Sequence, residues 1–360
     1  EGLRFQVLVN NSDGASHAYG SHLSFLIARR AFDDLMSHRL HHALWLASYQ
    51  CSSIVFTGQG KVGAENDQPA VDFQLTQRAD FFETLLAEQT TYHRPIVNSR
   101  DEALCGRGRN GLARLHCIFF DNTLSHGTTL LKVGVMQCML AMLEAGQIDL
   151  ARVLDAPLDA LLRWSHDPTL KVRAATMSGG DVTAVEHQLL LLEDAHRFAA
   201  TGGFAGIVPR ADEILALWTD TIEKLHSGNL SALAPRLDWV LKLGALRRAL
   251  RRRPELRWDS PALKHLDHLY SSLDPNEGLY WTLERAGATE RLVTADAIAT
   301  RVHEPPADTR AWTRAMLLRR AGAARVDQVD WDSIRFRHDP SWQLAGARIA
   351  DTQTRPASGR

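Results

Sequence analysis

Short apolar runs, bounded by turn-forming residues, predict β-strands in the first third of the chain. The expected strands cover residues 3–9, 21–28, 53–57, 71–78 and 114–120. A dense turn signal, NNSDG, ends the first of them. Apolar residues spaced three and four apart predict helices between the strands, at residues 32–50 and 125–145.

From about residue 157 the pattern becomes mostly helical. Amphipathic segments cover residues 183–200, 210–225 and 233–250. A rigid proline-containing connector at 303–308 precedes a predicted helix at 309–320 and a strand near 331–336. Strands first and helices afterwards favour an α+β fold with an antiparallel sheet over a doubly wound alternation.

Composition narrows the functional classes. The 360 residues carry a formal net charge of -1, which argues against a protein dedicated to binding nucleic acid. No apolar run reaches membrane-spanning length. The four cysteines form no CxxC pair, so reduced thiols in a cytoplasm are the expectation. Neither GxGxxG nor GxxxxGK[ST] occurs, and no familiar phosphate loop supports nucleotide binding.

Two histidines lie within apolar strand patterns. The period of two places Arg114, His116 and Ile118 on one strand face, and His22 interrupts another predicted strand. An imidazole among apolar residues is costly unless something binds it. Either a metal site or an internally hydrogen-bonded histidine accounts for each pattern.

Polar residues of the 71–78 strand share a face that carries Gln74, Thr76 and Arg78. Such a face is either solvated or functional. Residues 94–102 add Arg100, whose guanidinium could bind phosphate or join a surface cluster of ion pairs. Further along, the run from Arg247 to Arg257 could attract an acidic partner or form a solvated helix end.

Many segments of the chain resemble, in order and spacing, those of the depupylase and Pup-ligase family. They include NNSDGASHAYGSH, VFTGQGKVG, FQLTQRADFFE, RPIVNSRDE, RLHCIFFDN, SHDPTL and EPPADTRA. The residues of VFTGQGKVG, FQLTQRADFFE and SHDPTL resemble the depupylase branch more than the ligase branch. The resemblance covers nearly the whole chain.

The resemblance implies a glutamine-synthetase-like α+β fold, with a curved antiparallel sheet that holds Mg-ATP on its concave face. It implies a catalytic domain over residues 1–290, a small C-terminal domain over 291–350 and a tail over 351–360. Metal contacts would come from His22 and His116. Nucleotide contacts would come from the four remaining candidates, Arg78, Arg100, Asn122 and Arg310.

The implied activity is ATP-dependent hydrolysis of the side-chain amide or isopeptide bond at the C-terminal Gln or Glu of Pup or a Pup-like modifier. A Pup-like ligase working through a glutamyl phosphate, or a non-catalytic Pup-binding homologue, are the alternatives. The family's His-Glu-Asn triplet reads His22-Leu23-Ser24 here. We expect the catalytic aspartate in the family's N-terminal segment, which this chain lacks and which would act in cis or in trans.

Overall fold

The computed structural model describes residues 5–102, 111–307, 309–330 and 334–337. The chain divides into two compact units. The first comprises Glu1–Arg100 and Leu115–Arg291, and the second comprises Asp101–Arg114 and Leu292–Arg360. The fold mixes helices and strands, as the pattern predicts.

The helices up to residue 291 are α1 (Arg29–Asp33), α2 (Leu40–Thr57), α3 (His126–Glu144), α4 (Pro157–Ser165), α5 (Ala184–Ala200), α6 (Ala211–His226), α7 (Leu230–Leu233), α8 (Asp238–Arg252), α9 (Pro261–Tyr270) and α10 (Leu279–Arg285). One short π-helix, η1 (Asp34–His38), follows α1. Two short 3₁₀-helices are η2 (Ala79–Phe81) and η3 (Leu150–Arg152). The strands are β1 (Leu23–Ala28), β2 (Lys61–Val62), β3 (Phe73–Gln74), β4 (Thr84–Ala87), β5 (Pro95–Asn98), β6 (Leu112–Cys117), β7 (Arg173–Ala175) and β8 (Asp181–Thr183).

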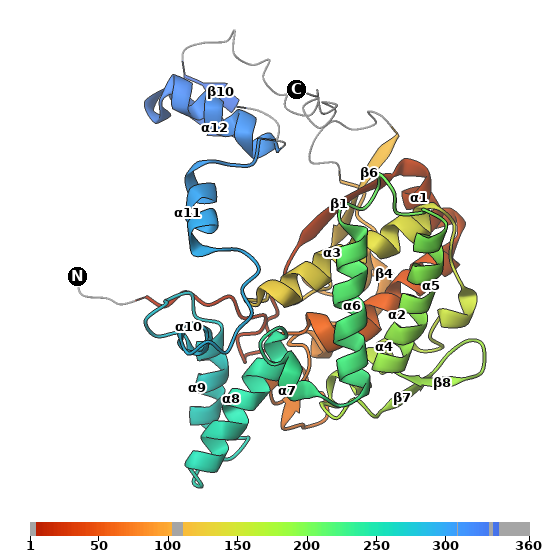
Figure 1. The fold of residues 1–360 in the computed structure, drawn as a ribbon, viewed down its shortest axis with the longest axis vertical. Coiled ribbons are helices and arrows are strands. Elements are labelled where there is room, and N and C mark those ends of the chain that lie inside the picture. Colours follow the sequence, from red (N-terminus) through yellow and green to blue (C-terminus); the bar gives the residue numbers. More distant parts are fainter. Residues whose placement is uncertain (1–4, 103–110, 308, 331–333, 338–360) are drawn as a thin grey trace. The chain divides into compact units, whose positions relative to one another are not determined.

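Helix α2 forms the centre of the first unit. It contacts α3, α4 and α5, and Figure 1 shows these helices crossing around it. From Ala43 onward nearly every residue of α2 is buried, Trp45 and Val55 among them. A helix that is buried on all sides is typical of such a core position, although α2 also buries polar residues such as Ser52 and Gln50.

The strands of the described residues are assigned as two-stranded pairs. Strand β1 pairs with β6, β2 with β3, β4 with β5 and β7 with β8. The β2–β3 and β7–β8 pairs are antiparallel, whereas β4 and β5 run parallel.

Three predicted strands are wrong in whole or in part. Residues 53–57 are the last turns of α2, because packing on every side outweighs their β-propensity. Of residues 3–9, the described part holds only an isolated bridge between Leu8 and Ser272. The strand predicted at 71–78 is limited to β3, because the backbone bends from Leu75 to Arg78 before it enters η2.

Several predicted helices are confirmed within a residue or two. They are α3, α5 and α6, and the 233–250 prediction corresponds to α8, which begins later, at Asp238. The start of α5 has a clear local cause. Thr183 accepts a hydrogen bond from the Glu186 backbone, and the Glu186 carboxylate accepts one from the Thr183 backbone.

The second unit contains α11 (Ala295–His303), α12 (Arg310–Ala321), η4 (Ala323–Arg325), β9 (Val326–Val329) and β10 (Ile334–Phe336). Strands β9 and β10 form an antiparallel pair. The helix predicted at 309–320 is confirmed as α12. None of the described helices combines the length and the apolar character needed to cross a membrane.

Candidate functional site

The two candidate metal ligands lie in contact. His116 Nε2 is 3.2 Å from His22 Nδ1, and the rings meet edge to face with centroids 5.1 Å apart. His116 lies on β6 and is buried, whereas His22 directly precedes β1 and is exposed. The two segments that the sequence placed in separate strands therefore present one imidazole pair, accessible from the His22 side.

This spacing is compatible with either of two states. In the metal-free protein one imidazole nitrogen donates to the other, so the pair shares a single proton between the facing nitrogens. Alternatively, the two facing nitrogens would be available as ligands to a metal ion, for which neutral imidazole is a common ligand. Among the described residues no group of three His, Cys, Asp or Glu side chains could hold a metal. The two imidazoles are thus at most part of a coordination sphere.

Arg78 is buried, with 1% of its surface exposed. Its guanidinium donates to the backbone carbonyls of Ile118 and Phe120, which directly follow β6. It also lies over the Phe82 ring, with 5.3 Å from Cζ to the ring centroid. Burial first, and then the charge of Arg94, lower the pKa of Arg78 to about 9, although Asp121 opposes that shift.

The same guanidinium supports the segment that carries His22. A Cβ built at Gly20 would come within 2.5 Å of Arg78 Cζ, so only glycine fits there without a rearrangement. The next residue, Ser21, donates its backbone N–H to the Phe120 carbonyl at 3.0 Å. Arg78 therefore lies between the two histidine-bearing segments and holds their relative position. The Arg78 Nε has no hydrogen-bond partner among the described residues.

Asn122 is positioned through its backbone. Its N–H donates to Asn11 Oδ1 at 2.7 Å, and Asn11 Nδ2 donates to its carbonyl at 3.3 Å. The preceding Asp121 is buried and accepts from the backbones of Gln59 and Gln77 and from the Thr76 hydroxyl. These contacts fix the chain on either side of Asn122.

The polar face predicted from Gln74, Thr76 and Arg78 is neither solvated nor open, because all three residues are buried. Gln74 donates to Asp80 Oδ2 at 2.8 Å, and Thr76 donates to Asp121 Oδ1 at 2.8 Å. These polar side chains form an internal hydrogen-bond network. The alternation of polar and apolar residues could not reveal this network, because it does not show whether a polar strand face is exposed or packed against other segments.

An ion cluster beside this network was missed by the sequence reasoning. Lys61 Nζ lies 2.8 Å from both Glu65 Oε2 and Asp80 Oδ2, and His166 Nε2 lies 2.9 Å from Asp80 Oδ1. Burial alone would raise the pKa of Asp80. The hydrogen bond from His166 and the charge of Lys61 outweigh burial and lower that pKa to about 2. Lys61, Asp80 and His166 come from three segments quoted above, VFTGQGKVG, FQLTQRADFFE and SHDPTL, but no local pattern showed that they meet in space.

Arg100 and Arg310 are the two remaining candidates. Arg100 follows β5 and is half-buried, and its backbone N–H donates to Asn98 Oδ1 at 3.2 Å. Arg310 begins α12 in the second unit, and its side chain lies outside the described residues.

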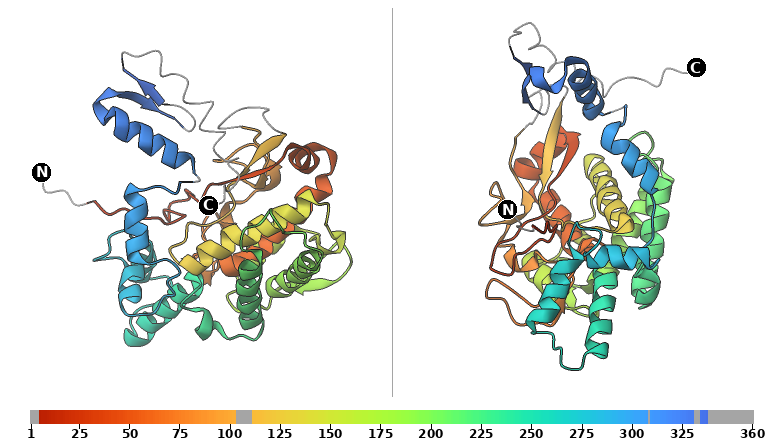
Figure 2. Two further views of the ribbon diagram at one scale, coloured as in Figure 1. Left: turned by 45° about the horizontal axis from the view of Figure 1, so that its top comes forward. Right: turned by 90° about the vertical axis from the view of Figure 1, so that its left-hand side faces the viewer.

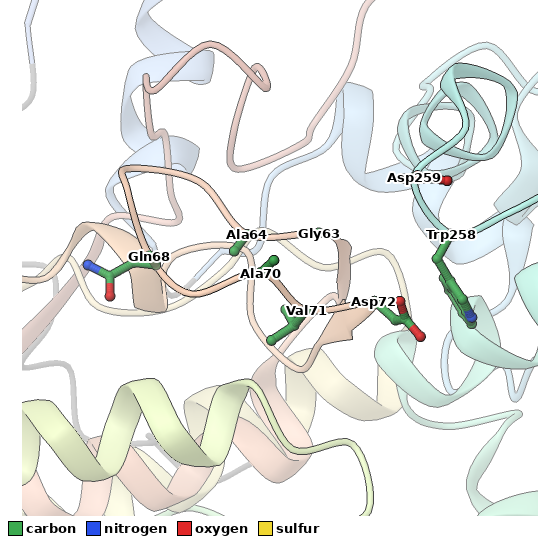
Figure 3. A pocket seen from close by; sticks show the side chains of 8 residues that line it. All are labelled: Gly63, Ala64, Gln68, Ala70, Val71, Asp72, Trp258 and Asp259. Atoms are coloured by element: carbon green, nitrogen blue, oxygen red, sulfur yellow. The ribbon is translucent and has the colours of Figure 1, made fainter.

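A separate surface hollow of about 570 Å³ lies between the loop that joins β2 to β3 and the turn before α9. Figure 3 shows Trp258 and Asp72 on one side of it and Gln68 on the other. The aromatic ring of Trp258 packs near that of Phe73, with centroids 6.3 Å apart. None of the candidate metal or nucleotide residues lines this hollow.

The chain is similar to proteins of known type along most of its length. The profile of the family described as "Pup-ligase protein" matches residues 1–335. A depupylase of Acidothermus cellulolyticus is 35% identical over 93% of the chain, and the chain spans 64% of that relative's length. A Pup–protein ligase of Micrococcus luteus is 36% identical over 98% of the chain and 75% of its own length.

Solved structures agree with this assignment. The ligase PafA in complex with Pup superposes with a TM-score of 0.79 at 25% identity, over 93% of this chain and 65% of that one. PafA in complex with ADP gives a TM-score of 0.78 at the same identity, over 93% of this chain and 71% of that one. The chain therefore belongs to the Pup-ligase protein family, whose relatives include both Pup ligases and depupylases.

Proposed function

We propose that the chain is the larger part of an enzyme that uses Mg-ATP to act on the side-chain amide or isopeptide bond at the C-terminus of Pup or a Pup-like modifier. The observation that carries this proposal is the His22–His116 pair, 3.2 Å apart and accessible at His22, in a chain that matches the family over residues 1–335. A glutamine-synthetase-like curved sheet and a cytoplasmic location belong to the same proposal.

The residues present fit a magnesium nucleotide in part. The facing imidazole nitrogens of His22 and His116 are available as metal ligands. Two imidazoles alone suit magnesium poorly, because this hard cation prefers oxygen ligands. In the proposal, oxygen ligands from outside the described residues complete the site. A bound magnesium nucleotide would supply a Lewis acid and, for ligation, a transferable phosphoryl group.

The chain's own residues would orient the site. His22 and His116 would contact the metal ion of the nucleotide complex. The proposed contacts to the nucleotide itself are Asn122, Arg100 and Arg310. Arg78 would act chiefly as a positioning residue, because its guanidinium is occupied by the Ile118 and Phe120 carbonyls. This assignment moves Arg78 from the phosphate face to the support of both histidine segments.

Hydrolysis is the proposed reaction, because the VFTGQGKVG, FQLTQRADFFE and SHDPTL segments resemble those of depupylases. Water would add to the carbonyl of the side-chain amide, and the amine or ammonia would leave. Ligation is a second candidate, since the Micrococcus luteus ligase matches 98% of the chain and the two solved neighbours described above are ligase structures.

One assay separates the candidates. The full-length protein is incubated with Mg-ATP and either a Pup conjugate, Pup ending in glutamine, or Pup ending in glutamate with a lysine-bearing target. Loss of conjugate and release of ammonia from the glutamine form would support hydrolysis. New conjugates from the glutamate form would support ligation instead. Neither product, with retained Pup binding, would indicate a non-catalytic homologue and overturn the enzymatic proposal.

A further inference from the structure

The outer face of the last two turns of α8 is composed of arginine. Arg247, Arg248, Arg251 and Arg252 are all exposed there, and we call these four residues the arginine face. The inner face of the same helix is buried, with Leu243 at 3% and Leu246 fully covered. The arginines are therefore directed away from the core by the packing of α8, and Figures 1 and 2 show this end of the helix at the periphery of the first unit.

The positive charges of the arginine face are not compensated within the described residues. None of its four guanidiniums forms an ion pair with a carboxylate there, whereas other exposed arginines do, including Arg163 with Asp159 and Arg210 with Glu213. In this region Arg257 has a carboxylate neighbour, Asp259, at 3.9 Å. The overall charge of -1 shows that this concentration is local and does not reflect a basic protein.

The spacing of these arginines along α8 places like charges next to one another, which destabilises the helix. Arg247 and Arg251 are four residues apart, as are Arg248 and Arg252, so like charges lie side by side on one helix face. Such pairs destabilise a helix, although the helix dipole favours cations in its last turn. An anionic partner would remove the repulsion and would gain bidentate guanidinium–carboxylate contacts.

We propose that the arginine face is a docking surface for an acidic segment of a polypeptide partner. Charge complementarity selects carboxylate side chains, and the helical rows present two parallel lines of guanidiniums to an extended or helical acidic segment. The neighbouring hollow carries Asp72 and Asp259, so that segment lies along α8 and not in the hollow. The inference is separate from the imidazole pair and does not depend on which reaction the protein catalyses.

The test measures binding of a fluorescein-labelled oligoglutamate peptide to the full-length protein by anisotropy, at low and at moderate salt. The parent should bind, with affinity that falls as salt rises. The variant R247Q/R248Q/R251Q/R252Q should bind about tenfold more weakly, because each exposed pair contributes little and four are lost. A matched control, R30Q/R39Q/R163Q/R210Q, removes the same charge from dispersed exposed arginines and should bind like the parent.

Thermal unfolding of each variant shows whether a change in peptide binding comes from loss of folding. The face variant should melt no lower than the parent, since glutamine retains helix propensity and like-charge pairs disappear. Equal loss of binding in both quadruple variants would show a general charge effect and overturn the proposal. Absence of oligoglutamate binding by the parent would overturn it too, as would equally tight binding of a single-stranded DNA of the same length.

Discussion

Gly20 and Arg78 set the local geometry around the imidazole pair. The Arg78 head is fixed by two backbone carbonyls and by burial, so it cannot easily move away from an added methyl group. Gly20 faces that head from the segment that leads to His22. The absence of a side chain at residue 20 is therefore a requirement of packing, with direct consequences for the position of His22.

Replacing Gly20 with alanine should destabilise the protein by about 1–3 kcal/mol, the usual cost of overpacking a closed site. Thermal or urea unfolding measures the change. Gly244 is the matched control, because a Cβ there would have Arg248 Nη1 as its nearest neighbour, at an ordinary 3.7 Å within helix α8. Gly244→Ala should stabilise by roughly 0.5–1 kcal/mol. Destabilisation of both variants by the same amount would contradict the account of Gly20.

Asp80 should make stability depend on pH in the acid range. Its pKa is near 2 in the folded protein and near 3.9 in an unfolded chain, so protonation favours unfolding. The contribution is complete above about pH 4 and is lost as pH falls from there through 2. Its size is about 2.5 kcal/mol.

Urea unfolding of the parent and of Asp80→Asn across pH 2 to 7 checks this prediction. The variant should be less stable near neutrality, because Lys61 loses a buried partner, and the difference should shrink as the parent's Asp80 becomes protonated. A difference that stays constant down to pH 2 would mean that Asp80 does not carry the pH dependence.

At the scale of the elements, α5 illustrates a boundary that is fixed locally. Thr183→Ala removes the side chain that accepts from the Glu186 backbone, and should destabilise the protein by about 1 kcal/mol. Thr183→Ser keeps the acceptor and should remain close to the parent in a thermal melt. If Thr183→Ser lost as much stability as Thr183→Ala, the effect would come from packing of the threonine methyl group and not from the cap.

Elements with local signals were predictable, and elements decided by tertiary packing were not. The apolar spacing of α3 and the amphipathic patterns of α5 and α6 identify these helices, and the capping pair Thr183 and Glu186 marks the start of α5. The segment 53–57 reads as a strand from its β-branched residues, but its burial on all sides in α2 decides for helix. Long-range contacts are not encoded in local periodicity.

In the candidate site, too, local signals were predictable from the sequence and tertiary contacts were not. Its histidines could be selected from the sequence because imidazoles interrupt apolar runs, and the family resemblance placed them together. The direction of Arg78 could not be predicted, because the period of two applies only while a strand continues, and β3 ends at Gln74. The Lys61–Glu65–Asp80–His166 cluster joins segments over 100 residues apart and left no local pattern.

At the scale of the whole molecule, the imidazole pair and the arginine face lie on different elements. The imidazole pair and Arg78 belong to the first unit, where α2 and its neighbours provide a rigid support. The arginine face lies on α8, outside the candidate site. Family membership covers residues 1–335, while the chain spans 64% of the length of the matched depupylase, so activity is a property to be measured on the full-length protein.

The central claim is that His22 and His116 together contact the metal of a magnesium nucleotide. Isothermal titration of ADP into the full-length protein, with and without magnesium, tests it in the parent, His22→Ala, His116→Ala and the exposed-histidine control His196→Ala. We predict that magnesium strengthens ADP binding in the parent and the control, and that either site variant loses about tenfold or more of that affinity only when magnesium is present. Equal affinities for ADP in all four proteins in the presence of magnesium, with unchanged melting temperatures, would contradict the account.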